Sequence, residues 1–572
     1  MCHTPLNRLW LLLGLLTLPA AADPCGAAYH TIADIQGDGQ HSPYAGQRLT
    51  TEGVVHQRAP FGFWIQTPAA QQDDNPATSE GLFIASRRLV KAGQRMRLTG
   101  LISERHSITR LTPEHMSVCA TESGVPPATR LTLPLTAAQW EAVEGMRVEG
   151  HALVSGFTEQ SGILSGSSLW ASAALMWQPT ELAPAAAVRG QNNRHQRLLL
   201  QAAGKQPLWR SQRPLRLGSR IPFFRGVVDS FTRPGQVIQP RLLASEVRLE
   251  PQPRPAAPHY PPAVSLVVAG FNVNNYFNGV PGPQGKIRFR HSRGAGNPSQ
   301  LLAQTQRLVR TLVAINADVL VLNEVENDGF GPHSAARQLL AALNREQDKS
   351  GIYRLVTPAH KGSDAIQTLL LYRPAVLQPV ASVQVLHQHN SAPDAQGKAL
   401  FNDYGNRPVL IQTFRHRQQT IQLAALHLKS KGSSCGETAQ QQNGGGRCNL
   451  SRSRAVRALQ HFLKHQALAA DHRLIVGDFN SYTAEQPLQP LFQAGWLRAA
   501  GFSETRSHSY NYRGLLGNLD HIFLSPSLRS KVRGYLSWAI NSVENPALAP
   551  YAATQEIYRS SDHDPQILLL EL

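Results

Sequence analysis

Cysteine is scarce in this sequence, with 5 residues in 572. No two of them have Cys-x-x-Cys spacing, which disfavours a thiolate zinc site or a redox motif. Cys2 lies in a segment expected to be removed, which leaves Cys25, Cys119, Cys435 and Cys448. An even number suits two disulfides in an oxidising compartment, with metal ligation by the thiols as the alternative. Proximity favours Cys435–Cys448 across a glycine-rich loop and Cys25–Cys119 around an N-terminal module.

Long hydrophobic runs are missing after the N-terminus. Residues 1–22 have the pattern of a secretory signal peptide: Arg8 is the only charge, residues 9–18 are apolar, and alanines 20–22 precede Asp23. The apolar core is too short to span a bilayer, and no later run is long enough. We expect a soluble, exported monomer without stable membrane insertion. The expected location is extracellular, with the periplasm and the cell surface left open.

Acidic residues are also few, with 38 Asp and Glu against 56 Lys and Arg, a net charge of +18 and a pI near 10.0. The excess is spread along the chain and forms no polybasic tail. Diffuse positive charge favours a polyanionic partner such as nucleic acid or an anionic cell surface. Charge alone indicates no chemistry.

Glycine-punctuated short strands dominate the first part of the chain, whose length allows about two to four domains. Residues 46–55 and 93–102 share the pattern Gly-x-Arg, an alternating strand, then Gly and two apolar residues. The pattern predicts a small barrel of the OB type over 23–124, and its return predicts a second OB-like β module over 125–250. Such barrels often bind single strands through exposed aromatics. The alternative, which we favour, is that the aromatics are core residues and the barrels are spacers.

Proline marks the next boundary. Residues 251–262 contain so many prolines that neither a central strand nor a helix is compatible with them, so we expect an extended linker. Strands then alternate with apolar-periodic segments, which predict helices at 299–315, 335–343 and 451–468. This alternation predicts an α/β sandwich over residues 263–572.

Polar residues stand at the ends of six predicted strands in this region. Residues 473–481 show the pattern best: three apolar residues and Gly477 precede Asp478 and Asn480, which lie two residues apart and so on the same side. A carboxylate and an amide suit Mg²⁺ and a phosphate, although an ordinary strand end with an Asx turn would look the same. The other five ends carry Asn272 and Asn274, Glu324, His427 with Lys429 and Lys431, Asp520, and Asp562 with His563.

The blocks Gly-Asp-Phe-Asn, Leu-Asp-His and Ser-Asp-His-Asp-Pro, in that order, resemble those of the endonuclease/exonuclease/phosphatase superfamily. The resemblance covers residues 262–572 and implies the four-layer α/β sandwich of deoxyribonuclease I. The signal peptide, OB-like modules, Asn-Glu-Val-Glu-Asn, His-Leu-Lys-Ser-Lys-Gly and a two-cysteine loop are further similar to secreted bacterial endonucleases of the ExeM/NucH type. This implies a Mg²⁺-dependent endonuclease for extracellular DNA that leaves 5′-phosphate ends, with RNA as a substrate and Ca²⁺ or Mn²⁺ as additional ions left open.

The resemblance implies a metal site formed by Glu324, with Asn272 and Asp562 completing or adjoining it. Asp478 and Asn480 would bind a second metal or orient the attacking water and the phosphate.

Two imidazoles complete the implied chemistry. His563 would be the general base or a phosphate contact, with Asp520 fixing its tautomer. His427 would protonate the leaving oxygen or hydrogen-bond a phosphate oxygen.

Five further residues are expected to contact substrate: Asn274, Arg407, Lys429, Lys431 and Tyr510. For Arg407 a turn before Pro408 is an equal alternative, and for Tyr510 core packing is.

Two other functions are compatible with parts of the sequence. Relatives with this fold also cleave phospholipids, but the sequence shows no exposed aromatic hairpin for membrane insertion. A non-catalytic surface-binding protein on a degenerate sandwich would not be expected to keep Glu324, Asp478, Asn480, Asp520 and His563 together.

Overall fold

The computed structural model of the chain describes residues 25–188, 196–229, 239–281, 287–289, 293–348, 352–549, 551 and 556–572. The predicted signal peptide lies outside the described residues. The chain folds as two compact units. Unit 1 holds residues up to Leu131 together with 135–149 and 225–243, and unit 2 holds 132–134, 150–224 and 244–572. The second predicted β module is therefore divided between the units, and the predicted domain boundaries stay a proposal.

Unit 1 contains a closed barrel of five strands in the order β1-β2-β3-β5-β4. The strands are β1 (Arg48–Ala59), β2 (Gly62–Gln66), β3 (Gly81–Ile84), β4 (Arg95–Glu104) and β5 (Thr109–Ala120). Alternate residues of β4, such as Met96 and Leu98, point into the apolar core, as the alternating pattern predicts. The Cys25–Cys119 disulfide is present and fixes the start of the described chain to β5. This unit is all-β apart from short helices, and its OB-like class stays a prediction.

The β segment of unit 2 is built around antiparallel pairs of β9 (Ser168–Ser172) with β11 (Arg197–Ala202) and with the end of β7 (Arg147–Gly156). Strands β13 (Arg220–Val228) and β14 (Arg241–Glu250) belong to the same sheet. After β9 the chain forms β10 (Met176–Trp177), α3 (Pro179–Leu182) and α4 (Ala185–Val188). β10 pairs with β28 (Leu515–Gly517), more than 300 residues later in the chain.

Two sheets form the centre of the C-terminal part of unit 2. One has six strands: β19 (Arg354–Leu355), β20 (Ile366–Tyr372), β18 (Val319–Glu326), β15 (Leu266–Tyr276), β31 (Gln566–Leu570) and β30 (Val532–Ser537). The other runs β21 (Gln378–Pro379), β23 (Arg407–His416), β24 (Gln419–His427), β25 (His472–Asp478), β29 (Asp520–Leu524) and β26 (Leu497–Arg498), with β22 (Gln384–Leu386) beside β23.

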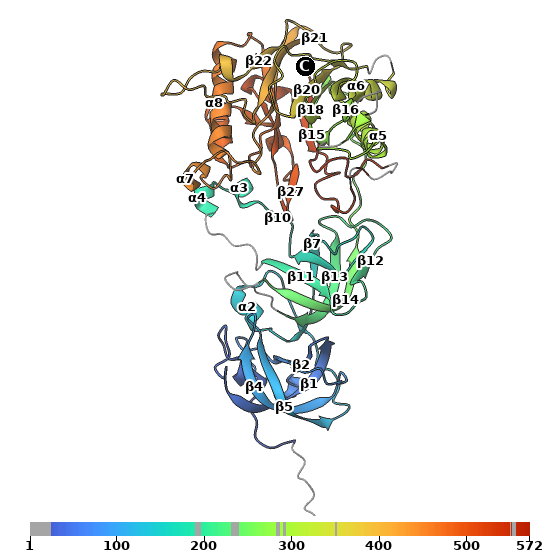
Figure 1. Cartoon of the computed structure of the whole chain (residues 1–572), viewed down its shortest axis with the longest axis vertical. Helices are drawn as coiled ribbons and strands as arrows, with labels where there is room; N and C mark the ends of the chain where they lie inside the picture. Colours follow the sequence, from blue (N-terminus) through green and yellow to red (C-terminus); the bar gives the residue numbers. More distant parts are fainter. Residues whose placement is uncertain are drawn as a thin grey trace, which may run out of the picture. The chain divides into compact units, whose positions relative to one another are not determined.

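Three apolar clusters show how the layers stack. Val268 and Val321 of the first sheet pack with Val476 of the second between the two sheets. On the outer face of the first sheet lie α5 (Pro298–Ile315) and α6 (Ala335–Arg345), and α8 (Asn449–His465) covers the second (Figure 1). The order helix–sheet–sheet–helix is the predicted α/β sandwich, and the three predicted helices fall within a few residues of their expected bounds.

The proline-rich segment 251–262 contains no helix or strand, as expected. It is not a detached spacer, however, because the Arg254 guanidinium forms ion pairs with Glu544 and Glu556, and Trp538 Nε1 donates to Ala256 O at 2.8 Å. Within the described residues, no helix has both the length and the apolar character needed to cross a membrane.

Candidate active site

The neighbouring strands β24, β25 and β29 bring three of the predicted residues together. His427 and Asp520 are the strand partners of Asp478 on either side. Gly477 makes this closeness possible: its φ is +147°, and a Cβ there would lie 1.9 Å from Leu426 O. Only glycine fits such a close approach of two backbones.

Asp478 is buried and held by hydrogen bonds on three sides. Its Oδ2 accepts from Asn272 Nδ2 at 3.1 Å, its Oδ1 accepts from Asn480 N at 2.7 Å, and its backbone N donates to Asn323 Oδ1 at 3.1 Å. Burial raises the pKa of Asp478, and the neighbouring Asp520 carboxylate raises it further. A buried carboxyl of raised pKa is able to hold or accept a proton near neutral pH.

Asp520 and His563 form the predicted acid–imidazole pair, with Oδ2 and Nδ1 2.6 Å apart. Burial lowers the pKa of His563, but the carboxylates of Asp520, Asp562 and Asp478 outweigh burial and raise that pKa well above its usual value. The raised pKa favours the imidazolium form, in which Nδ1–H is directed to Asp520 and Nε2–H is left as a second donor. Such an imidazolium suits contact with a phosphate oxygen, the second of the two roles expected for it.

His427 is fully buried and is not one of the residues that line the pocket described below. Its Nε2 lies 3.5 Å from Asp478 Oδ2, and its Nδ1 has no hydrogen-bond partner among the described residues. Burial, followed by the positive charges of Arg407 and His563, lowers its pKa well below the usual value. A neutral imidazole behind Asp478 is placed to support that carboxylate, and we find no route by which it would reach a leaving oxygen directly.

Glu324 and Asp562 supply the carboxylates of the predicted metal site, and both line the pocket. Neither forms an ion pair with Lys or Arg among the residues that the structure describes, although Glu324 interacts electrostatically with Arg407 and Asp562 with His563. Carboxylate oxygens are the ligands that Mg²⁺ prefers in proteins, so these two residues fit the ion. Asn272 is buried and is not among the residues that line the pocket. Its Nδ2 donates to Asp478, which it orients, and its Oδ1 accepts from Asn274 N at 3.0 Å. A place in or beside the metal site stays a prediction for it.

The backbone at Glu324 is unusual. Its φ is +68°, and the register of β18 shifts between Leu322 and Val325. A non-glycine residue in this conformation costs about 1–3 kcal/mol, and such residues concentrate at functional sites. The irregularity breaks the strict alternation of the strand, so that Asn323 donates to Leu426 O at 3.0 Å inside the sandwich while Glu324 lies at the pocket.

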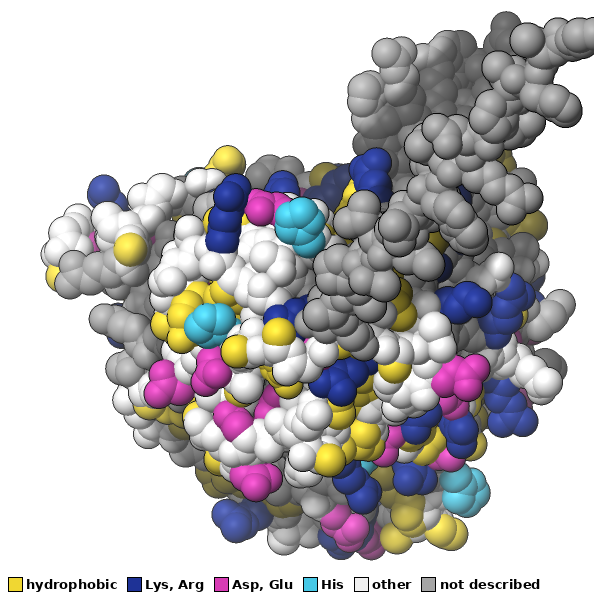
Figure 2. All heavy atoms as spheres, turned by 90° about the horizontal axis from the view of Figure 1, so that it is seen from below, with side chains coloured by type: hydrophobic (Ala, Val, Ile, Leu, Met, Phe, Trp, Pro, Cys, Tyr) yellow, Lys and Arg dark blue, Asp and Glu magenta, His cyan; other side chains and the backbone are white. Residues whose placement is uncertain are grey.

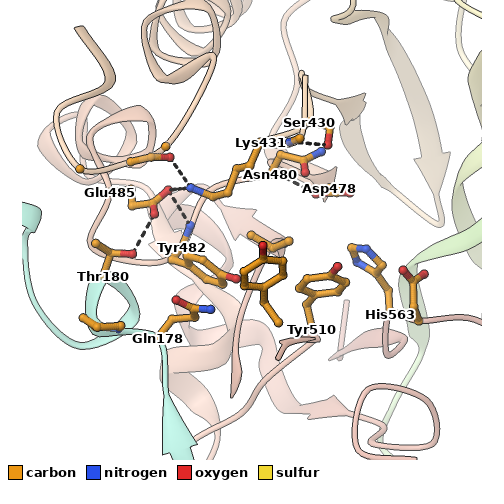
Figure 3. Close-up of a pocket in the computed structure, with 18 of the residues that line it drawn as sticks. Gln178, Thr180, Ser430, Lys431, Asp478, Asn480, Tyr482, Glu485, Tyr510 and His563 are labelled. Carbon is orange, nitrogen blue, oxygen red and sulfur yellow. Dashed lines mark hydrogen bonds and ion pairs between the residues drawn. The ribbon is translucent and has the colours of Figure 1, made fainter. Parts of the chain in front are cut away.

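These groups share a pocket of about 720 Å³. The predicted site residues that line it are Asn274, Glu324, Lys431, Asp478, Asn480, Tyr510, Asp562 and His563. Figure 3 shows the Tyr510 ring beside His563, and the ring centroids are 4.7 Å apart. Burial raises the pKa of Tyr510, so its hydroxyl stays neutral and able to donate.

The three predicted basic contacts differ in position. Lys431 lies in the pocket, with Nζ 2.5 Å from Glu485 Oε2 and 5.1 Å from the centre of the Tyr482 ring (Figure 3). Burial lowers the pKa of Lys431 to about 8. Lys429 lies outside the pocket lining, with Nζ 4.8 Å from the centre of the exposed Tyr404 ring.

Arg407 is buried, its Nη1 donates to Leu428 O at 2.9 Å and its Nη2 lies 3.3 Å from Asp364 Oδ2. It holds the loop after β24 and is not among the residues that line the pocket. The expected phosphate contact stays a prediction.

Sequence reasoning missed a wall of the pocket that comes from residues 178–188, long before the catalytic region. Gln178 and Thr180 line the pocket, and Thr180 Oγ1 donates to Glu485 Oε1 at 2.8 Å (Figure 3). Next to them, the buried Glu181 accepts hydrogen bonds from Thr483 N and from Asn518 N, both at 3.1 Å. Nothing in the sequence around Glu181 signals this role, because its partners are about 300 residues away.

The glycine-rich loop after β24 forms another side of the pocket. Gly444, Gly445 and Gly446 line it, and the Cys435–Cys448 disulfide, present as predicted, encloses them. Lys431 Nζ donates to Gly445 O. The disulfide thus limits the freedom of a loop that faces the site.

The chain belongs to the endonuclease/exonuclease/phosphatase family, whose model matches residues 269–563. Among solved structures it is similar to a family protein from Leptotrichia buccalis, with 14% identity, 54% of this chain and 100% of the other covered, and a TM-score of 0.35. It is also similar to the human Nocturnin catalytic domain, with 15% identity, 53% of this chain and 93% of the other covered, and a TM-score of 0.35. A third similar structure is a Bacteroides thetaiotaomicron mannosyl-6-phosphatase, with 14% identity, 54% of this chain and 100% of the other covered, and a TM-score of 0.33. No curated protein matches the chain.

Proposed function

We propose that the chain is a secreted Mg²⁺-dependent endonuclease that hydrolyses phosphodiester bonds of extracellular DNA, with RNA as a possible second substrate. One observation carries the proposal: the carboxylates of Glu324 and Asp562 share a pocket with Asp478 and with the His563 imidazole, which is paired with Asp520. Carboxylates for a cation and a cationic donor in one pocket suit a phosphate ester, which carries negative charge on its nonbridging oxygens.

Glu324 and Asp562 would hold Mg²⁺, which when bound neutralises charge on a phosphate oxygen and lowers the pKa of water. His563 would donate from Nε2 to a nonbridging oxygen, while Asp520 keeps the ring in place through Nδ1. Asp478, whose pKa burial raises, would accept a proton from the attacking water. Water oxygen then bonds to phosphorus as the bond to the 3′-oxygen breaks, and the departing 3′-oxygen takes a proton from solvent, which leaves a 5′-phosphate and a 3′-hydroxyl.

DNA is supported as the substrate by charge and by pocket shape. The net charge of +18 favours a polyanion. The rings of Tyr482 and Tyr510 line the pocket between Gln178 and His563, where a sugar or base next to the scissile phosphate could stack (Figure 3). The two disulfides suit an oxidising compartment and thus a secreted enzyme.

A substrate panel tests the proposal. The purified chain is incubated in Mg²⁺ with closed circular DNA, with single-stranded RNA and with phospholipid vesicles in parallel. We expect circular DNA to be nicked and linearised, which requires an endonuclease because a circle has no end. Release of phospholipid head groups with intact DNA would instead support the lipid-cleaving function, and no turnover on any substrate would support a binding protein.

A further inference from the structure

A second cluster of metal-ligand side chains lies outside the pocket, formed by His360, His387 and Asp403. One ligand atom from each lies within 4.8 Å of the other two. None of the three lines the active-site pocket. They come from three separate loops: His360 follows β19, His387 follows β22 and Asp403 precedes β23.

The three side chains already face one another. His360 Nε2 lies 3.1 Å from Asp403 Oδ2, and the His360 and His387 ring centroids are 4.4 Å apart. Asp403 Oδ1 accepts from Gln388 N at 3.0 Å, which fixes the carboxylate. All three residues are partly exposed, so an ion can enter from solvent.

A hydrogen bond between His360 and Asp403 explains only part of this arrangement. The His387 ring also has a local contact, since its Nδ1 accepts from His389 N at 3.3 Å at the start of the turn 388–390. The neighbouring His389, whose ring centroid is 5.8 Å from that of His387, is exposed and available as a further ligand.

We propose that His360, His387 and Asp403 form a second cation site that takes a divalent transition metal of the Zn²⁺ class. Two imidazoles and a carboxylate are borderline ligands that suit Zn²⁺ and Co²⁺, whereas Mg²⁺ takes oxygen ligands and keeps its waters. The site is distinct from the proposed catalytic metal site in both position and donor type.

The site joins two loops that border the active site. In the His360 loop, the carbonyl of Asp364 accepts a hydrogen bond from Asn327 Nδ2 at 2.8 Å, three residues after Glu324. In the Asp403 loop, Asn406 Oδ1 accepts from Lys429 N at 2.9 Å. A bound ion therefore connects the loop that contacts Asn327, just after β18, to the loop that contacts Lys429, just after β24. Its role is structural, since no ligand reaches the pocket.

The test is a Co²⁺ titration of the metal-free full chain in excess Mg²⁺, which occupies oxygen-donor sites. We expect one Co²⁺ per chain with visible d–d absorption, displaced by Zn²⁺. Asp403→Asn removes the charge yet keeps an oxygen for Gln388 N, and it should abolish this uptake, as should His360→Asn. Glu324→Gln should leave it unchanged.

A matched control is His461→Asn. The rings of His461 and His465 also lie 4.6 Å apart, but among the described residues this pair is not part of a cluster with a carboxylate. Zn²⁺ should raise the Tm of the wild type and of the His461 variant, and not that of Asp403→Asn. Absence of Co²⁺ uptake by the wild type, or equal uptake by wild type and Asp403→Asn, would overturn the proposal. Circular dichroism confirms that each variant is folded before either result is scored.

Discussion

Glu324 is the residue on which the proposed metal chemistry depends most directly. It combines a left-handed backbone, a pocket position and a carboxylate without a Lys or Arg partner among the described residues. Replacing it with Gln keeps the shape and removes the charge. We expect Mg²⁺ affinity and turnover to fall by orders of magnitude while the Tm stays unchanged, measured by Mg²⁺ titration of DNA cleavage.

Glu326 offers a matched control on the same strand. Its Oε2 accepts from Asn278 N at 2.9 Å, and it does not line the pocket. Glu326→Gln should therefore leave the Mg²⁺ dependence unaltered. Wild-type turnover of Glu324→Gln at low Mg²⁺ would remove Glu324 from the site.

At the level of single residues, the sequence predicted positions better than contacts. The sequence predicted that Asp478, Asp520 and His563 would lie close together at strand ends. Period-two alternation shows where each strand ends and which side chains share a face, and adjacent strands bring these ends together. Alternation could not show that Arg407 would be buried against Leu428 O, or that Lys431 would be held by Glu485. Long basic side chains take their direction from neighbours that are distant in sequence.

At the level of elements, helices and strands of the sandwich were predictable because apolar periodicity is strong there and glycine or proline marks the boundaries. The predicted helix at 299–315 corresponds to α5 (Pro298–Ile315). The segment β10–α3–α4 was not predictable, since its apolar residues show no clear period and its contacts are with β28 and the loop after β25.

Glu181 in α3 holds two catalytic loops at once, through Thr483 near Asn480 and through Asn518 near Asp520. Glu181→Ala would leave these buried donors unpaired. We expect a loss of about 2–4 kcal/mol in the free energy of unfolding, because hydrogen bonds to a charged group contribute about 1.5–3 kcal/mol each and part is recovered by water. Urea unfolding measures this loss, and kcat should fall more than KM changes.

The exposed Glu159 lies in the same β segment and serves as the control. Glu159→Ala should change neither quantity. Equal effects of the two substitutions would show that Glu181 does not position the loops.

A cluster of acids in unit 1 predicts a pH dependence of stability. Burial raises the pKa of Glu141 to about 7 and that of Glu144 well above its usual value. The folded state then binds more protons than the unfolded state above about pH 4.5. The stability contributed by Glu141 is therefore complete at low pH and is lost as pH rises from about 4.5 to about 7, and Glu144 adds a loss in the same direction. With the partial exposure of Glu141 taken into account, we expect a loss of about 1–2 kcal/mol.

Thermal unfolding at about pH 5 and about pH 8 measures this difference. Glu141→Gln should flatten the pH dependence of the unit 1 transition. An unfolding temperature of unit 1 that is the same at both pH values, or that is higher at the higher pH, would contradict the assignment.

At the scale of the whole molecule, charge is diffuse. Figure 2 shows Lys and Arg side chains scattered among acidic ones on the face drawn, as expected from a sequence without a polybasic tail. Under the proposed function, long-range attraction of DNA would therefore come from many residues, and salt dependence would identify those that contact phosphates.

Lys429 and Lys431 form a matched pair for that purpose. Lys429 lies beside the exposed Tyr404, whereas Lys431 is bonded to Glu485. Lys429→Ala should raise the KM on long DNA and reduce the salt slope by about 1, because one phosphate contact is lost. It should do less to a small phosphodiester, which has no flanking phosphates.

Lys431→Ala removes the same charge, and we expect it to lower kcat with little change in the salt slope. Salt titrations of KM separate the two outcomes. A slope flattened equally by both substitutions would show that the ion pair with Glu485 opens when DNA binds.

The measurement that tests the central claim most directly is nicking of closed circular DNA by the full chain, in Mg²⁺ and after chelation, beside Asp520→Asn. Asn keeps an acceptor for His563 Nδ1 but removes the charge that raises the pKa of His563. The account predicts rapid nicking with 5′-phosphate ends, its loss on chelation, and a decrease of about 10²–10⁴-fold for Asp520→Asn. Nicking that survives chelation, or a variant as fast as the wild type, would contradict it.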